Sequence, residues 1–317
     1  MEIVNSLEEI KKADITKKSA LALGYFDGIH RGHRAVIQDA VQQGISRGYT
    51  STVFTMIQRP RDYFSGEQTP RLLTLPQKLS LLERLGVERV VLIDFESICD
   101  ISAEDFVAEV LGKLLHTGYL SCGFNYHFGK GGTADGETMK KLGAACGIEV
   151  SAKERIEYGG QPVSSSRIRA CVDEGDIVSA NTMLGRAFSI EAPVTHGQKL
   201  GRQWGTPTAN QQYPDGLILP PFGVYASYAV LDNEVQFGVT NIGVRPTVVR
   251  NSDTVLAETW FPDYRGNDFY LHTLDLHLLD RIRAERKFLD TEQLKEQIYR
   301  DASAARQIFS LRSSSFV

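Results

Sequence analysis

Residues 23–33, LGYFDGIHRGH, decide the fold of the first half of the chain. They follow the apolar run 20–23 and precede a segment whose apolar residues repeat at helical spacing, a pattern typical of strand, glycine turn and helix. His30 and His33 are therefore expected at the turn and in the first helical turn, beside the positive end of the helix dipole. Such a position binds anions, so the stretch predicts a site for a nucleotide phosphate. Two ordinary surface histidines beside a turn are the alternative interpretation.

Length and charge narrow the class of protein. The chain has 317 residues, 42% of them hydrophobic and 23% charged, with a net charge of -4. This length predicts two domains, and the charge provides no basic field for nucleic acid. No apolar run reaches the ~20 residues of a membrane helix, and the N-terminus lacks the apolar core of a signal peptide. We expect a cytoplasmic protein with small-molecule partners, no nucleic-acid or membrane partner and weak homo-oligomers.

Alternating strand and helix patterns fill the first 150 residues and predict an open α/β sheet. A parallel strand is expected at residues 49–55, a strand buried on both faces at 90–93 and a further strand at 120–123. Helices are expected at 75–85 and 102–115, and a long loop at 57–74. Ligands in such sheets bind beyond the carboxyl ends of the strands, where the histidine turn is expected. The four cysteines form no metal-binding pattern and are expected to be free, mostly buried thiols.

The composition and the hydrophobic pattern of the sequence change after Gly185. Residues 187–280 hold short alternating segments rich in Gly, Pro, Thr, Val and Tyr, which predict a small β-barrel. A helical pattern returns at Thr291. The predicted domains are therefore residues 1–185 and 186–317.

Three stretches of the first domain resemble one family. Residues 23–33 match the GxFDGxHxGH pattern of flavin-type HxGH nucleotidylyltransferases, residues 123–136, GFNYHFGKGGTADG, match Gx[DN]FxFGxxxxG with one conservative exchange, and residues 163–169, VSSSRIR, resemble ISSTxIR. By themselves the second stretch reads equally as a flexible surface loop and the third as a capped helix start. Their order along the chain makes the resemblance strong.

A fourth stretch opens the second domain. Residues 196–210, HGQKLGRQWGTPTAN, resemble the riboflavin kinase pattern HGxxxGRxxGxPTAN, with Thr206 where phenylalanine is usual. Further matches are PFGVY at 221–225, NIGVRPT at 241–247 and RIRAERKF at 281–288, although Leu271 stands where glycine is frequent. A polar hairpin is the alternative interpretation of residues 196–210. Glu258 follows an apolar stretch, at the place where the riboflavin kinase family has its catalytic glutamate, and a solvated strand residue is the alternative interpretation there.

Together these patterns resemble the prokaryotic bifunctional riboflavin kinase/FMN adenylyltransferases, or FAD synthetases, over about residues 20–305. The resemblance implies a Rossmann-like nucleotidylyltransferase domain followed by a six-stranded riboflavin kinase barrel with a C-terminal helix. It implies ATP, riboflavin and FMN as substrates and Mg²⁺ as the metal. The residue roles that it implies are catalysis by Glu258, His30 and His33; phosphate binding by Gly24, Phe26, Asp27, Gly32, Ser165, Arg169, Gly197, Lys199, Gly201 and Arg202; flavin binding by Arg59, Asn125, Phe128 and Arg283; and Mg²⁺ binding by Thr208 and Asn210.

One departure leaves alternatives open. Where the family has TFxPHP, residues 55–60 read TMIQRP, so Gln58-Arg59 replaces a Pro-His pair. A titratable imidazole is replaced by a permanent cation with five hydrogen-bond donors. This change could strengthen the binding of the FMN phosphate, or it could block the turn that adenylyl transfer needs. We therefore consider three interpretations: a two-step enzyme, an enzyme with one working half, and a non-catalytic flavin sensor. The joint presence of His30, His33, Asn210 and Glu258 favours catalysis.

Overall fold

A computed structural model describes residues 1–12, 15–195, 206–245, 254–266 and 272–316. The chain divides into two compact units, described separately below. The first unit comprises residues 1–69 and 75–164, and the second comprises residues 70–74 and 165–317. The last change of unit along the chain therefore falls between residues 164 and 165, and the expected domain boundary near residue 185 stays a prediction.

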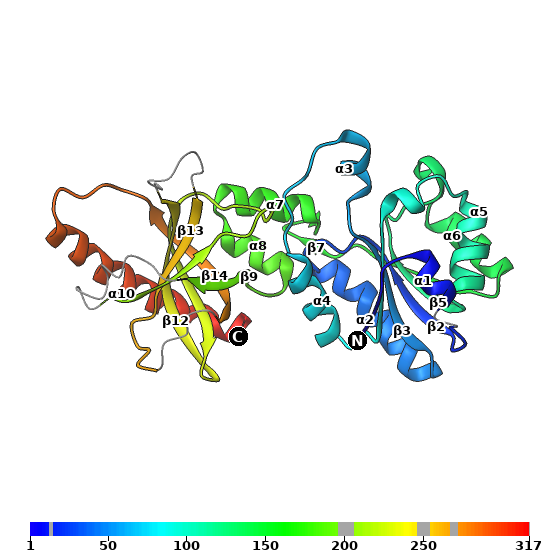
Figure 1. Cartoon of the computed structure of the whole chain (residues 1–317), viewed down its shortest axis with the longest axis horizontal. Coiled ribbons are helices and arrows are strands. Elements are labelled where there is room, and N and C mark those ends of the chain that lie inside the picture. The colour runs from blue at the N-terminus through cyan, green and yellow to red at the C-terminus, as the bar shows by residue number, and fades with distance from the viewer. Residues whose placement is uncertain (13–14, 196–205, 246–253, 267–271, 317) are drawn as a thin grey trace. The chain divides into compact units, whose positions relative to one another are not determined.

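A six-stranded parallel sheet forms the centre of the first unit, in the order β1-β4-β3-β2-β5-β6 (Figure 1). The first half of this unit contains β1 (Glu2–Val4), α1 (Leu7–Lys12), β2 (Ser19–Leu23), α2 (Arg31–Arg47), β3 (Thr50–Met56), α3 (Pro60–Ser65), α4 (Leu75–Arg84) and β4 (Arg89–Ile93). Its second half contains η1 (Phe95–Ser97), α5 (Ala103–Asp105), the π-helical η2 (Phe106–Leu114), β5 (Thr117–Gly123), η3 (Lys130–Gly132), α6 (Gly136–Ala145), β6 (Glu149–Lys153), β7 (Glu157–Tyr158) and β8 (Gln161–Pro162).

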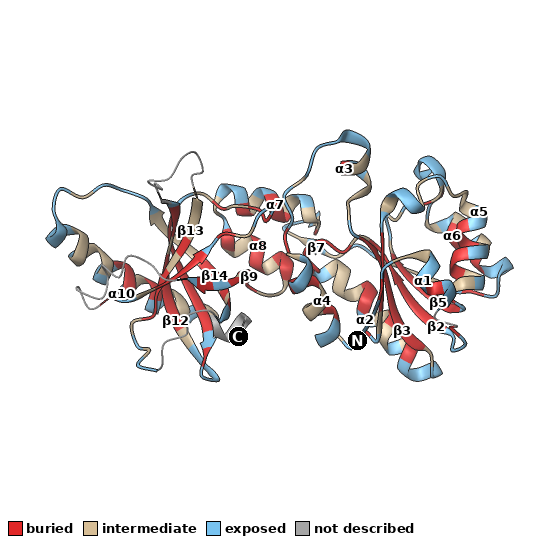
Figure 2. Ribbon diagram, viewed as in Figure 1, coloured by how far each residue is buried: buried red, intermediate tan, exposed pale blue. Residues whose placement is uncertain are grey.

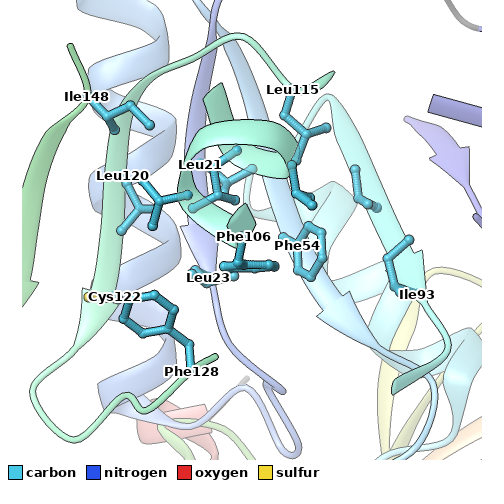
Figure 3. Packing of buried hydrophobic residues seen from close by; sticks show 14 of the residues in the cluster. Leu21, Leu23, Phe54, Ile93, Phe106, Leu115, Leu120, Cys122, Phe128 and Ile148 are labelled. Carbon is cyan, nitrogen blue, oxygen red and sulfur yellow. The ribbon is translucent and has the colours of Figure 1, made fainter. Parts of the chain in front are cut away.

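Strand β2 is buried on both faces, which explains why all of its residues after Ser19 are apolar. Leu21 and Leu23 point to one face and pack in a core with Phe54 of β3 and Phe106 of η2 (Figure 3). Their neighbours Ala20 and Ala22 point to the opposite face, since side chains alternate along a strand. Helix α2 packs on β2, β3 and β5, so the small alanines let it approach the sheet closely.

A closed antiparallel barrel forms the centre of the second unit, in the order β10-β13-β12-β11-β14-β9. The elements of this unit are α7 (Ser165–Glu174), α8 (Ile177–Leu184), β9 (Phe188–Thr195), β10 (Thr208–Gln212), β11 (Gly223–Leu231), β12 (Glu234–Arg245), β13 (Thr254–Trp260), β14 (Thr273–Ala284) and α10 (Thr291–Phe316). The expected α/β unit, six-stranded barrel and C-terminal helix are confirmed.

The barrel buries one face of its strands inside and covers part of the other face with α10. The interior contains a chain of hydroxyls, since Thr240 bonds Ser227 at 2.7 Å and Thr259 at 2.9 Å. Outside, Val239 and Trp260 pack against Ala302 and Ala305 of α10. Figure 2 shows many buried residues in the barrel strands, and the first seven residues of β11 are all buried.

The stretch expected as a loop at residues 57–74 holds more structure than its composition suggested. Pro60 occupies the first position of α3, where its missing N–H is not needed. Buried Asp62 then closes the stretch, accepting bonds from the Thr69 N–H at 3.0 Å and the Thr69 hydroxyl at 2.7 Å. The loop prediction was therefore wrong for residues 60–65.

Residues 70–74 belong to the second unit although they lie within the sequence of the first. The Arg71 N–H donates to the Gly216 carbonyl at 2.7 Å, and the Ile218 N–H donates to the Arg71 carbonyl at 2.8 Å. Leu72 and Leu73 are buried. The chain therefore passes between the units three times.

The four cysteines are free, as expected, but only Cys122 is buried. Cys122 lies in a central strand, whereas Cys146 ends a surface helix and is exposed, so the expectation of mostly buried thiols was wrong. In the described part of the chain, no helix combines the length and the hydropathy needed to cross a bilayer.

Candidate functional site

The histidine turn connects β2 to α2 through a strained backbone. Phe26 and Ile29 both have positive φ, at 55° and 39°, and Gly28 between them has a φ of 86°. Left-handed conformations of this kind cost a non-glycine residue ~1–3 kcal/mol and persist where the surroundings enforce them, often at functional sites. Gly24 is needed for a different reason, because a Cβ there would lie 2.9 Å from the Phe26 ring.

His30 and His33 lie where the sequence predicted them. His30 caps α2, and its Nδ1 accepts the His33 N–H at 3.2 Å. An Nδ1 that accepts carries no proton, so the neutral ring holds its proton on Nε2. The two imidazoles stack with centroids 3.6 Å apart, and the Phe26 ring meets His33 edge-on at 5.3 Å. Gly32 makes room for this arrangement, since a Cβ there would lie 3.2 Å from the His30 ring.

The sheet order brings three predicted stretches to one edge. Strand β2 lies between β3 and β5, and parallel strands end at the same edge, so the segments that follow all three strands meet there. After β3 comes Arg59, half-buried at the start of α3. After β5 come Asn125, which is exposed, and Phe128, whose ring is buried in the core against Phe106. Any influence of Phe128 on a flavin would therefore pass through the backbone of its loop. Asp27 is buried within the histidine turn.

Ser165 and Arg169 lie in the first two turns of α7, which belongs to the second unit. Arg169 is buried, and its Nη2 donates to the Ser166 hydroxyl at 3.4 Å. Their expected role at the phosphate site stays a prediction.

A buried lysine beside the histidine turn was missed by the sequence analysis. Lys78 of α4 is 8% exposed, and its Nζ donates to the Tyr25 carbonyl at 2.6 Å and to the Thr55 hydroxyl at 2.7 Å. Burial lowers the pKa of Lys78 to about 7, against a smaller opposing effect of Asp27. The sequence held a signal, because Lys78 occupies the same helical stripe as Leu75 and Leu82.

In the barrel, Glu258 of β13 stands between two asparagines on neighbouring strands. It is directly opposite Asn210 of β10 on one side and Asn241 of β12 on the other. Directly paired residues point to the same face of a sheet, so these three polar side chains form one row. Thr208 shares the face with Asn210, whose Nδ2 donates to the Thr208 carbonyl at 3.1 Å. The expected base and the expected metal ligands are thus close together.

Arg283, expected to bind flavin, is held by the C-terminal helix. Its Nε lies 3.1 Å and 3.0 Å from the two oxygens of Asp301, and its Nη2 donates to Asp301 at 2.8 Å. Asp301 is 3% exposed at its side chain and also accepts from Gln297 at 2.7 Å. The flavin role of Arg283 stays a prediction, and the structure adds a buried ion pair that the sequence did not indicate.

Four expected phosphate-binding residues, Gly197, Lys199, Gly201 and Arg202, lie outside the described residues. Among the residues that are described, no group of three or more His, Cys, Asp and Glu side chains could hold a metal ion. Thr208 and Asn210 offer hydroxyl and amide oxygens instead, hard ligands of the kind that Mg²⁺ accepts alongside phosphates.

Fold and site together define a nucleotidylyltransferase-type α/β unit with a histidine turn at its ligand edge, followed by a barrel with a Glu-Asn row. Comparisons with known proteins agree with this class. The model of the FAD synthetase family matches residues 12–167, and the model of the riboflavin kinase family matches residues 184–309. The chain belongs to the bifunctional riboflavin kinase/FMN adenylyltransferase family.

Relatives of that description match the chain over nearly its whole length. The protein of Pseudomonas fluorescens is 34% identical over 97% of this chain and 98% of its own, and that of Bacillus subtilis is 34% identical over 92% and 93%. A solved structure from Streptococcus pneumoniae, described as a macrolide-efflux protein, has the same fold, with a TM-score of 0.83 and 26% identity over 96% of this chain and 99% of its own.

Proposed function

We propose that the chain converts riboflavin to FMN and FMN to FAD, using one ATP in each step. The observation that carries the proposal is that both family models match one chain and that full-length relatives bear the name of both activities. The geometry supports it, because the histidine turn lies at the ligand edge of the first unit and Glu258 pairs with two asparagines in the barrel of the second.

In the kinase step, the 5′-hydroxyl oxygen of riboflavin attacks the γ-phosphorus of ATP, and the bond from that phosphorus to ADP breaks. Glu258 accepts the hydroxyl proton, which makes it the general base. Thr208 and Asn210 are the residues that would hold Mg²⁺, which neutralises phosphate charge when bound. Positioning and charge neutralisation supply most of the rate in phosphoryl transfer, and Gly197, Lys199, Gly201 and Arg202 are proposed to hold the phosphates.

In the adenylyltransferase step, a phosphate oxygen of FMN attacks the α-phosphorus of the second ATP, and pyrophosphate leaves. His30 and His33 hold the triphosphate at the positive end of α2. Gly24, Phe26, Asp27 and Gly32 shape the turn. In this step Arg59 and Asn125 are proposed to contact flavin, Phe128 to shape the flavin loop, and Ser165 and Arg169 to bind the leaving phosphates. This step needs no protein nucleophile. Arg283 is proposed to contact flavin in the kinase step.

Several sequence expectations stay predictions beside this proposal. They are Mg²⁺ as the metal, small molecules as the only partners, weak self-association and a cytoplasmic location.

The test is a chromatographic product assay with ATP and Mg²⁺, given riboflavin in one tube and FMN in another. FAD from both tubes is expected. If riboflavin is converted to FMN but FMN is not converted to FAD, the chain is a kinase whose first unit is inactive. The replacement of Pro-His by Gln58-Arg59 would then be the first cause to test. Flavin binding without turnover in either tube would support a sensor and contradict the proposal.

A further inference from the structure

Lys78 has an unusual position on α4. The helix buries three side chains, Gln77, Lys78 and Leu82, so two of the three are polar. A leucine at residue 78 would continue the apolar stripe. The lysine instead places an ammonium in a site that is 8% exposed. Burying a charged group in this way costs stability, and packing therefore does not explain the residue.

The ammonium takes part in a closed triangle of hydrogen bonds. Lys78 Nζ donates to the Tyr25 carbonyl and to the Thr55 hydroxyl, and the same hydroxyl donates to the Tyr25 carbonyl at 2.8 Å. The triangle joins three elements of the first unit, namely α4, the end of β3 and the turn after β2. Asp27 is the charged group that acts on the ammonium in this site.

The Tyr25 carbonyl is part of the peptide that precedes Phe26. Fixing that carbonyl fixes the peptide plane and so restrains Phe26 in its left-handed conformation. The Phe26 ring in turn contacts His33 edge-on, and His33 stacks on His30. A continuous path of contacts thus leads from Lys78 to the two histidines.

We propose that Lys78 is a positioning residue of the adenylyltransferase site, which holds the strained turn in the conformation that presents His30 and His33 to the triphosphate. This inference rests on the proposed function. Lys78 acts through the Tyr25 carbonyl and need not contact either substrate. Its positive charge adds to that of the α2 N-terminus and favours the anionic ligand.

Two variants and one control test the assignment in the full-length chain. Lys78→Met removes the ammonium at similar volume, Lys78→Arg keeps a permanent positive charge, and Lys141→Met removes an exposed lysine of the same unit. Two properties are measured: kcat/KM for ATP in FAD formation from FMN, and amide hydrogen exchange of the peptide spanning residues 24–33.

Lys78→Met is expected to lower kcat/KM for ATP by about tenfold or more and to speed exchange in residues 24–33 to a similar degree. The kcat/KM of the kinase step in Lys78→Met should stay within about twofold of the wild-type value. Both steps in Lys141→Met should stay within the same limit. The pH dependence of kcat/KM reports the ionisation of groups in the free enzyme. Lys78 loses its proton as the pH rises above about 7, whereas an arginine stays charged. The kcat/KM of the wild type should therefore fall several-fold relative to that of Lys78→Arg between about pH 7 and pH 8.5.

Unchanged exchange in residues 24–33 of Lys78→Met would overturn the proposal, and so would a Lys78→Arg variant no better than Lys78→Met. A reduced rate with the wild-type pH profile would indicate a purely structural residue and would also overturn it. A wild-type chain that makes no FAD from FMN would refute the proposed function instead, and the exchange comparison would still decide the role of Lys78.

Discussion

Replacing Lys78 with methionine should make the first unit more stable in a pH-dependent way. Burial lowers the pKa of Lys78 from 10.5 to about 7, so the unfolded chain binds more protons than the folded one between these values. The destabilisation is fully present below pH 7 and is relieved as the pH rises. Since a shift of one unit corresponds to 1.36 kcal/mol, its upper limit is about 5 kcal/mol, which the two hydrogen bonds of the ammonium partly offset.

The change with pH is the sharper measurement, because it does not depend on the hydrogen-bond energies. For one group with these two pKa values, linkage gives about 2 kcal/mol of additional stability between about pH 6.5 and pH 8.5. The wild type should gain this amount, and Lys78→Met should not. Subtracting one protein from the other cancels the titration of all other groups.

Urea denaturation at the two pH values is the assay. Both tryptophans of the chain, Trp204 and Trp260, fall within the sequence of the second unit, so their fluorescence follows that unit. Far-ultraviolet circular dichroism follows both units, and the transition that fluorescence does not detect belongs to the first. Lys141→Met is the control and should track the wild type. Equal gains in the wild type and Lys78→Met, within about 0.5 kcal/mol, would refute the reasoning.

Three further outcomes are expected. Glu258→Gln should lower kcat of the kinase step by ~10²–10⁴-fold and leave FAD formation from FMN intact; an unchanged kinase rate would exclude Glu258 as the base. Gly24→Ala places a Cβ 2.9 Å from the Phe26 ring and should lower kcat/KM for ATP in the FAD-forming step by ~10²-fold, and a wild-type value would show that the ring can move harmlessly. Arg283→Met leaves the buried Asp301 carboxylate without its cationic partner and should destabilise the second unit by about 3 kcal/mol in fluorescence-detected unfolding, with recovery in the double variant that adds Asp301→Asn.

Local signals in the sequence account for much of the fold. The apolar strand, the glycines and the helix start around His30 lie within about one element of each other, so their geometry followed from short-range rules. The row formed by Glu258 and its two asparagines could not be predicted from short-range rules. Family patterns pointed to Asn210 and Glu258 separately, and only the strand register places them opposite each other.

Interactions between distant segments explain what the sequence did not reveal. Lys78 gains its role from Tyr25 and Thr55, which lie 53 and 23 residues away. The ion pair of Arg283 with Asp301 likewise depends on how the last helix docks on the barrel. A periodicity pattern identifies the face on which such a side chain lies, but it does not identify the partner that the side chain meets.

The short segment Pro70–Thr74 has a consequence for any attempt to dissect the molecule. Its backbone bonds to Gly216 and Ile218, so the second unit is assembled from two separate parts of the chain. No single scission of the polypeptide releases both units whole. A fragment ending before α7 would keep these five residues without their bonding partners, and a fragment beginning there would lack them. The two activities are thus encoded in series but folded as interleaved pieces, and recombination at one crossover point would not exchange either unit intact.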